Sequence, residues 1–228
     1  MAEDGSKALG SLDLEEVPVF PLPNVVLLPG GHLPLHVFEA RYREMTSDVV
    51  AGRGRMAVAR LQPGFEENYE GRPPIHLVCG VGEVVQHERR ADGRWDIVLS
   101  GISRARVCEE LPATLAYRVI RVELLGDVTA ADPLALGAWQ KELSASWARL
   151  APYLPSPVRD VCKRSRDDEG VGAWADRISA TLIADPDERQ RLLEELDPGE
   201  RLCRLVERLH ELSRALNAGS AVPNSALN

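Results

Sequence analysis

Histidines at helical spacing are the first residues in this chain that could do chemistry. His32 and His36 stand four residues apart, the spacing at which a helix presents two zinc ligands on one face. Pro34 lies between them and favours extended backbone, and no third ligand follows nearby. We therefore expect no metal site here. The remaining histidines are expected at outward strand positions (His76, His87) and at a solvated helix position (His210).

Nucleophiles with the surroundings of a catalytic residue are also missing. Ser100 precedes Gly101, but the glycine that would complete a G-x-S-x-G elbow is absent before it. Two cysteines fall in apolar strand-like runs (Cys79, Cys108) and two in helical runs (Cys162, Cys203). Free cysteine in such places usually behaves as a small buried hydrophobe. The sequence therefore predicts no catalytic residue.

Glycine patterns give no nucleotide site. No G-x-x-x-x-G-K-[ST] motif occurs, so the backbone cradle and lysine that hold nucleotide phosphates are missing. Gly80-Val81-Gly82 begins like a dinucleotide loop but continues as a β-rich run without a third glycine, which favours a turn or bulge. We expect no cofactor and no enzymatic activity.

Charge and cysteine usage narrow the class of protein. Residues 1–125 hold 14 basic against 18 acidic side chains and residues 126–228 hold 13 against 17, so each part carries −4 of the net −8. Neither part is a basic nucleic-acid arm. The four cysteines are widely spaced, and no apolar run approaches the roughly 20 residues that span a bilayer. These features favour a cytoplasmic protein without membrane association.

Periodicity divides the chain into a β-rich part and a helical part. Between residues 15 and 125, short runs predict strands, with one helix whose stripe is Phe38, Tyr42, Met45 and Val49. The predicted strands are Val17–Phe20, Val25–Leu28, Met56–Leu61, Ile75–Cys79, Gly82–Glu88, Trp95–Leu99, Ala105–Glu109 and Tyr117–Leu125. Residues 1–14 and 218–228 are expected to be disordered ends.

Residues 126–217 show the 3.6-residue period of helices. The predicted helices are Leu134–Leu150, Pro157–Arg166, Val171–Ala184, Pro186–Leu196 and Pro198–Asn217. Asp132, Asp185 and Asp197 each precede a proline, where a carboxylate can accept from the free amides of a helix start. The apolar stripe of the last helix is expected to face the core.

The stretch from Val17 to Tyr42 places five prolines among strongly apolar residues. We expect these prolines at strand ends and corners of an irregular barrel, where a missing donor is tolerated. Glu39 and Arg41 follow Phe38 and are expected to form a structural ion pair, with a ligand-binding pair as the alternative. Arg104 and Arg106 flank Ala105 and would form at most a minor basic patch.

Several segments resemble the N-terminal, substrate-binding domain of ATP-dependent Lon proteases. The similarity covers about residues 17–212 and departs at Gly31-His32-Leu33 and in the loop from Arg60 to Gly71. The segments that carry it are Phe20-Pro21-Leu22-Pro23-Asn24, Pro34-Leu35-His36-Val37-Phe38-Glu39-Ala40-Arg41-Tyr42, Leu99-Ser100-Gly101-Ile102-Ser103-Arg104-Ala105-Arg106-Val107, Ala175-Asp176-Arg177-Ile178, and Gln190-Arg191-Leu192-Leu193-Glu194 with Arg201-Leu202.

The resemblance implies an α+β fold, with a PUA-like β pseudo-barrel over residues 15–125 that holds one inserted helix, and a helical bundle over residues 126–217. It implies a non-enzymatic module that binds unfolded or apolar polypeptide segments, as an adaptor or regulator in protein quality control, with a homodimer expected. No ATPase or Ser-Lys protease element is found in this chain. The candidate peptide-binding or structural residues are Leu33, Leu35, Phe38, Glu39, Arg41 and Tyr42.

Two other classes of function stay open at this point. A PUA-like barrel is compatible with RNA binding, although the net charge of −8 makes nucleic acid an unfavourable partner. An uncharacterised enzyme would use a pocket between barrel and bundle, which needs polar groups converging in one cleft.

Overall fold

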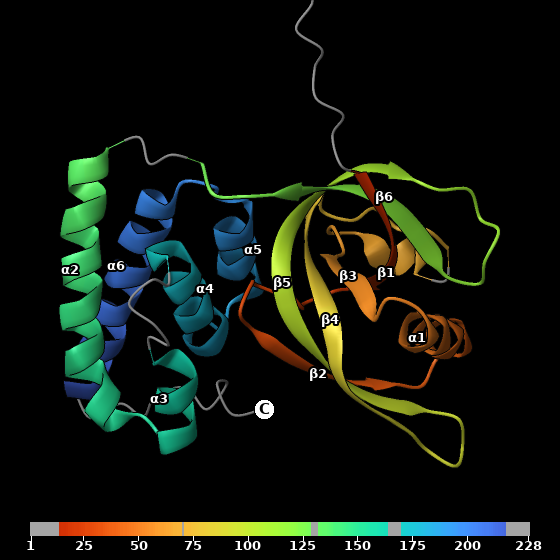
Figure 1. The fold of residues 1–228 in the computed structure, drawn as a ribbon, viewed down its shortest axis with the longest axis horizontal. Coiled ribbons are helices and arrows are strands. Elements are labelled where there is room, and N and C mark those ends of the chain that lie inside the picture. The colour runs from red at the N-terminus through yellow and green to blue at the C-terminus, as the bar shows by residue number, and fades with distance from the viewer. Residues whose placement is uncertain (1–13, 70, 129–131, 164–169, 218–228) are drawn as a thin grey trace, which may run out of the picture.

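A mixed sheet of six strands closes on itself to form a barrel beside a group of helices (Figure 1). The computed structural model describes residues 14–69, 71–128, 132–163 and 170–217. The strands are β1 (Leu14–Leu22), β2 (His32–Val37), β3 (Arg55–Arg60), β4 (Val78–Arg89), β5 (Trp95–Glu110) and β6 (Arg118–Leu125). Their order is β2-β5-β4-β3-β1-β6, and pairing of β5 with β6 completes the ring. The β1–β3 pair is parallel and the other pairs are antiparallel.

Strand β5 pairs with β4 on one edge and, because of its length, with both β2 and β6 on the other. Its first part, Trp95 to Ser100, pairs with β2, and its later part, Arg104 to Glu110, pairs with β6. Strand β2 therefore lies at the end of the sheet order and extends it beyond the closed ring. Helix α1 (Ala40–Ala51) inserts between β2 and β3 and packs Tyr42, Met45 and Val49 into the barrel core.

The helical part follows β6 and lies to one side of the barrel (Figure 1). Its helices are α2 (Pro133–Leu150), α3 (Ser156–Cys162), α4 (Val171–Leu182), α5 (Pro186–Glu194) and α6 (Pro198–Asn217). Two short 3-10 helices also occur: η1 (Phe65–Asn68) between β3 and β4, and η2 (Ala151–Tyr153) between α2 and α3. The predicted aspartate caps are confirmed: Asp132 accepts from Leu134 and Ala135, Asp185 from Asp187, and Asp197 from Gly199. The stripe of α6 is buried, as expected, at Leu202, Leu205, Val206 and Leu209.

The α+β fold class is confirmed, while several strand predictions are wrong in detail. Val25–Leu28 is extended but pairs with no strand, and His32–Val37 is a strand that periodicity did not single out. Strand β4 contains the predicted run Gly82–Glu88 but only the end of the run Ile75–Cys79, whereas the runs Trp95–Leu99 and Ala105–Glu109 join into the single strand β5. Gly80-Val81-Gly82 contains the expected bulge, between Val81 and Gly82. The predicted disordered ends lie outside the described residues except for Leu14, where β1 already begins. The last part of the predicted helix Pro157–Arg166 also lies outside the described residues.

The prolines of the opening stretch lie where backbone pairs on one side only. Strand β1 pairs with β6 from Leu14 to Val19 and with β3 from Val19 to Leu22, so each part has one unpaired edge. Pro18 and Pro21 occupy these parts, and Pro34 lies in β2, whose strand partner is β5. A proline nitrogen is tolerated where it faces away from the ladder. Pro18 and Pro34 are therefore inside strands, whereas Pro21 lies near the end of β1 and Pro23 and Pro29 lie in a bend and a turn, as the sequence predicts.

The segment Val25–Leu28 runs between the barrel and the bundle and contributes to both cores. Val26 and Leu28 belong to the bundle core, while Leu27 belongs to the barrel core and Val25 packs against it. An extended backbone points successive side chains to opposite sides. This segment, which we call the seam, is therefore a direct apolar link between the two parts.

Glycines in β4 and β5 make room for the seam. A Cβ at Gly80 would lie 2.0 Å from the carbonyl oxygen of Leu27, and one at Gly101 would lie 2.2 Å from that of Leu28. The Gly30 amide donates to Gly101 at 2.8 Å, and the Gly101 amide donates to Gly31 at 2.8 Å. Only a residue without a side chain lets the two backbones approach this closely.

A buried ion-pair network joins the same two parts. Arg104 on β5 donates to both oxygens of Asp176 on α4, at 2.8 and 2.5 Å, and to the carbonyl of Leu193 at 3.2 Å. Arg201 on α6 lies 3.2 Å from Asp176 and donates to Asp127 at 2.7 and 2.8 Å. The side chains of Arg104 and Asp176 are each 4% exposed, so the expectation of a surface basic patch is wrong for Arg104.

Substituting Gly101 by alanine tests the contact at the seam. We expect Gly101→Ala to lower the free energy of unfolding by about 3 kcal/mol, because the new methyl group meets backbone that cannot move away. Urea denaturation would measure this. In the control Gly137→Ala the methyl group meets nothing within 4 Å, and alanine should stabilise α2 slightly. Equal stability of Gly101→Ala and the wild type would contradict the proposed contact.

Neutralising Asp176 tests the ion-pair network. Asp176→Asn leaves the guanidinium groups of Arg104 and Arg201 without their shared carboxylate, and we expect a loss of about 3 to 5 kcal/mol in unfolding free energy. The control Asp187→Asn removes an exposed partner of Arg60 and should change stability little. A small loss for Asp176→Asn would mean that water or other groups compensate the two cations.

Candidate functional site

The six residues singled out from the sequence do not form one surface. Leu33 and Leu35 are half-buried and pack against the barrel core, and Tyr42 is buried against Phe20 with ring centroids 4.3 Å apart. Burial raises the pKa of Tyr42 to about 12. Phe38 precedes α1 instead of joining its apolar stripe, and its side chain is 62% exposed. The assignment of Phe38 to the helix core is therefore wrong.

Glu39 and Arg41 form the expected ion pair at the start of α1. The Arg41 guanidinium lies 3.0 Å from Glu39 and stacks on the ring of Tyr42 at 4.7 Å. It also lies 5.6 Å from the ring centroid of Tyr69, whose hydroxyl donates to Glu39 at 3.2 Å. This arrangement fixes both charges against aromatic side chains near the barrel.

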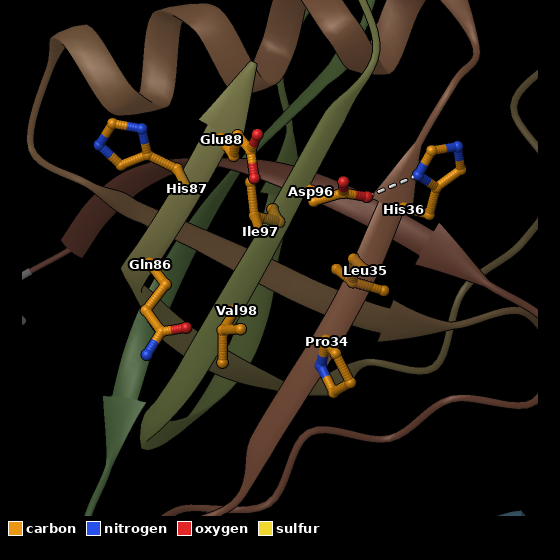
Figure 2. Close-up of a pocket in the computed structure, with 9 residues that line it drawn as sticks. All are labelled: Pro34, Leu35, His36, Gln86, His87, Glu88, Asp96, Ile97 and Val98. Carbon is orange, nitrogen blue, oxygen red and sulfur yellow. Dashed lines mark hydrogen bonds and ion pairs between the residues drawn. The ribbon is translucent and has the colours of Figure 1, made fainter. Parts of the chain in front are cut away.

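A groove crosses the outer face of β2, β5 and β4 (Figure 2). Strand register places Pro34, Val98 and Gln86 in one row across the three strands, and His36, Asp96 and Glu88 in the next. The cavity has a volume of about 500 Å³. Its lining is Pro34, Leu35, His36, Gln86, His87, Glu88, Asp96, Ile97 and Val98. We call this surface the β2–β5–β4 groove.

The groove is apolar at one end and charged at the other. Pro34 and Val98 form the apolar row, whereas at the other end His36 Nδ1 lies 2.7 Å from Asp96, as the dashed line in Figure 2 marks. Arg90 donates to the second oxygen of Asp96 at 2.5 Å, and Arg94 lies 3.4 Å from His36 Nε2. Hydrogen bonds from His36, and then from Arg90, lower the pKa of Asp96.

Phe38 extends the outward row of β2 beyond the groove. Its ring is stacked near that of His36, with centroids 6.3 Å apart. Residues two apart on a strand face the same side, so Pro34 and His36 point outward while Leu33 and Leu35 point inward. Phe38 follows the end of β2, and its exposed ring lies beside that of His36. None of the residues lining the groove is a serine, threonine, cysteine or lysine.

A Ser-His-Glu cluster between α2 and α6 has the composition of a catalytic triad but not its geometry. Ser146 Oγ and Glu142 Oε1 each lie 3.0 Å from the same nitrogen of His210, Nε2. In a triad, the acid binds the nitrogen opposite to the one that faces the nucleophile. Arg149 also donates to Glu142 and Ser146, both at 2.8 Å. The cluster joins the two helices. His210 is partly exposed, as the sequence predicts, but its ring also contacts Ser146 and Glu142 on α2.

Cysteine burial follows the prediction at two positions. Cys79 and Cys162 are buried, and burial raises the pKa of the Cys79 thiol to about 12. Cys108 is exposed and Cys203 is half-buried, so the expectation of burial is wrong for Cys108. Among the described residues, no group of three or more histidine, cysteine or acidic side chains is arranged to hold a metal ion. None of the described helices is both long and apolar enough to cross a membrane.

Comparison with known families identifies the class of protein that this fold and groove represent. The ATP-dependent protease La (LON) substrate-binding domain family matches residues 16–211. The chain therefore belongs to this family, and the part of Lon that it matches is the substrate-binding domain rather than a catalytic module.

Individual relatives agree with this assignment. The chain is 27% identical over 217 residues to Lon protease 2 of Myxococcus xanthus, covering 93% of this chain and 26% of the relative, and 30% identical over 218 residues to Lon protease of Roseiflexus castenholzii, covering 91% and 25%. It thus spans about a quarter of the length of these curated relatives.

Solved structures share the fold at lower identity. The N-terminal domain of a Mycobacterium avium complex Lon protease superposes with a TM-score of 0.62 at 22% identity, over 86% of this chain and 99% of that one. A Lon N-terminal domain protein from Xanthomonas campestris gives 0.58 at 22% identity, over 85% and 98%. Both confirm the barrel-plus-bundle architecture.

Replacing Asp96 by asparagine tests the charged end of the groove. The folded-state pKa of Asp96 is lowered, so this carboxylate stabilises the fold above its unfolded pKa of about 4, and that contribution is lost as pH falls through the folded value. Unfolding free energies of Asp96→Asn and wild type, measured from pH 7 downward, should differ most at pH 7 and converge in acid. A difference in unfolding free energy that stays constant with pH would show that the charge of the Asp96 carboxylate does not stabilise the fold.

Proposed function

We propose that this chain is a polypeptide-binding module that holds extended, apolar segments of unfolded proteins in the β2–β5–β4 groove. The observation that carries the proposal is the open groove itself, with the exposed Phe38 beside it. Membership of the Lon substrate-binding domain family supports the same class of ligand. Large exposed apolar side chains next to a concave surface commonly mark interaction sites.

The groove suits an extended chain better than a compact ligand. It lies across three neighbouring strands and is open along its length, so successive side chains of an extended peptide could contact Pro34, Val98 and Phe38. At the charged end, Arg90 and Arg94 offer donors to backbone carbonyls or to an acidic side chain. Apolar contacts would supply affinity and these donors would supply orientation.

The wider role that we propose is that of an adaptor or regulator in cytoplasmic protein quality control, without catalytic activity of its own. The groove lining has no serine, threonine, cysteine or lysine, and the polar cluster around His210 has the wrong geometry for a triad. Self-association as a homodimer stays a prediction.

The alternative functions receive no comparable support. RNA binding needs a basic surface, whereas the chain carries a net charge of −8. An enzyme pocket between barrel and bundle would have to occupy space that Val26, Leu28 and the Arg104–Asp176 pair fill.

Truncating Phe38 tests the proposed function. We expect Phe38→Ala to weaken binding of a reduced, carboxymethylated unfolded protein about tenfold, because an exposed aromatic contact is removed. Fluorescence anisotropy with the labelled unfolded protein would measure the affinity. Thermal stability should hardly change, because the Phe38 side chain is mostly in solvent.

A matched control is available on the far side of the molecule. Leu134, at the start of α2, is 87% exposed and lies outside the groove, so Leu134→Ala should leave the affinity unchanged. Equal losses for both variants, or no binding by the wild-type protein, would contradict a polypeptide site in the groove.

A further inference from the structure

A second cavity, of about 280 Å³, lies where α1 and β6 begin. Three arginines line it: Arg41 from α1, Arg72 from the chain before β4, and Arg118 from the first position of β6. Tyr42 contributes to the wall, and Ala113 and Leu115 form an apolar rim. This arginine cavity is distinct from the β2–β5–β4 groove, with which it shares no lining residue.

Two of these arginines share a single carboxylate. Arg118 donates to both oxygens of Glu110, at 2.9 and 2.7 Å, and its third contact is the carbonyl of Pro73 at 2.8 Å. Arg72 lies 3.0 Å from the same Glu110 and donates to the carbonyl of Leu111. Arg118 is only 8% exposed, so its guanidinium is held rigidly at the cavity wall.

The positive excess at the cavity comes from Arg72 and Arg118, which share the carboxylate of Glu110, whereas the third arginine has a carboxylate of its own. Arg41 pairs with Glu39. The three arginines that line the cavity are thus paired with two described carboxylates, Glu39 and Glu110. Because burial raises the pKa of Tyr42 to about 12, its phenol stays neutral near pH 7 and adds no negative charge. This local excess of positive charge contrasts with the net charge of −8 of the whole chain.

The apolar rim limits what else the ligand can carry. Leu115 is 46% exposed, and Ala113 is also exposed beside the positive wall. A planar carboxylate matches the fork of a guanidinium group, and a short aliphatic group matches this rim. A nucleotide or other large ligand is too bulky for a cavity of about 280 Å³.

We propose that the arginine cavity binds a carboxylate that carries a short aliphatic group. The same chemistry is offered by the C-terminal carboxylate of a polypeptide that ends in an aliphatic residue and by a free small carboxylic acid. The inference does not depend on the groove being a polypeptide site.

Titrations with matched acid and amide ligands test this proposal on the whole chain. N-acetyl-leucine and N-acetyl-leucinamide differ at the carboxyl group, as do two pentapeptides that end in a free or an amidated leucine. Calorimetry at low salt should show acids binding at about millimolar dissociation constants or tighter, and at least about tenfold more tightly than their amides.

Arginine variants locate the binding. Arg72→Gln should weaken binding of the acids about tenfold and leave the amides unaffected, because Arg72 is partly exposed and contributes charge rather than core packing. Arg106→Gln, an exposed arginine that pairs with Glu123 outside the cavity, is the matched control and should change nothing. Circular dichroism would verify that both variants are folded.

The outcomes separate the two sources of ligand and the two sites. Binding of the free-acid peptide alone would identify a longer chain end as the ligand, and equal binding of N-acetyl-leucine would show that one small acid with a leucine side chain is enough. Phe38→Ala should retain the preference for acids even where groove binding is lost. Equal affinities for acid and amide, or acid binding unaffected by Arg72→Gln, would overturn the proposal.

Discussion

The close passage of the seam, Val25–Leu28, between barrel and bundle is the constraint on which the rest of the structure depends. Its backbone lies so near Gly80 and Gly101 that a Cβ at either position would overlap a carbonyl oxygen. Since its side chains alternate between the two cores, the seam fixes how barrel and bundle lie against each other. Strand β2 follows directly after the Pro29-Gly30 turn, so the seam also positions the outer face that carries the groove.

The buried ion pairs reinforce this arrangement from a different side. Arg104 reaches from β5 to Asp176 on α4, and Arg201 connects Asp176 to Asp127. Buried charges of this kind contribute little net stability but penalise any packing that separates them. Several segments that resemble Lon substrate-binding domains, those with Gly101, Arg104, Asp176 and Arg201, therefore meet at one joint. They specify the architecture, while the groove that we propose for binding lies on the other side of the sheet from the barrel core.

Local signals in the sequence predicted most of the helical part, and tertiary contacts account for what was missed. Asp-Pro pairs at 132–133, 185–186 and 197–198 fixed three helix starts because capping is a local interaction. The seam is a short β-rich run between turn residues, which predicts a strand, but its side chains enter two cores and its backbone pairs with no strand. Arg104 and Arg106 share one strand face, and only the helices packed over Arg104 decide that it is buried. The same holds for Phe38, which the helical period assigned to the core and the structure leaves exposed.

We infer that the seam makes barrel and bundle one cooperative unit, which native-state hydrogen exchange can test. The amides to follow are those of β5 around Ile97 in the barrel and those of α4 around Ile178 in the bundle, at increasing denaturant. If the seam couples the two parts, both sets of amides open with the same free energy and the same denaturant dependence. Exchange of the α4 amides through a separate opening of lower free energy, with β5 still protected, would contradict it.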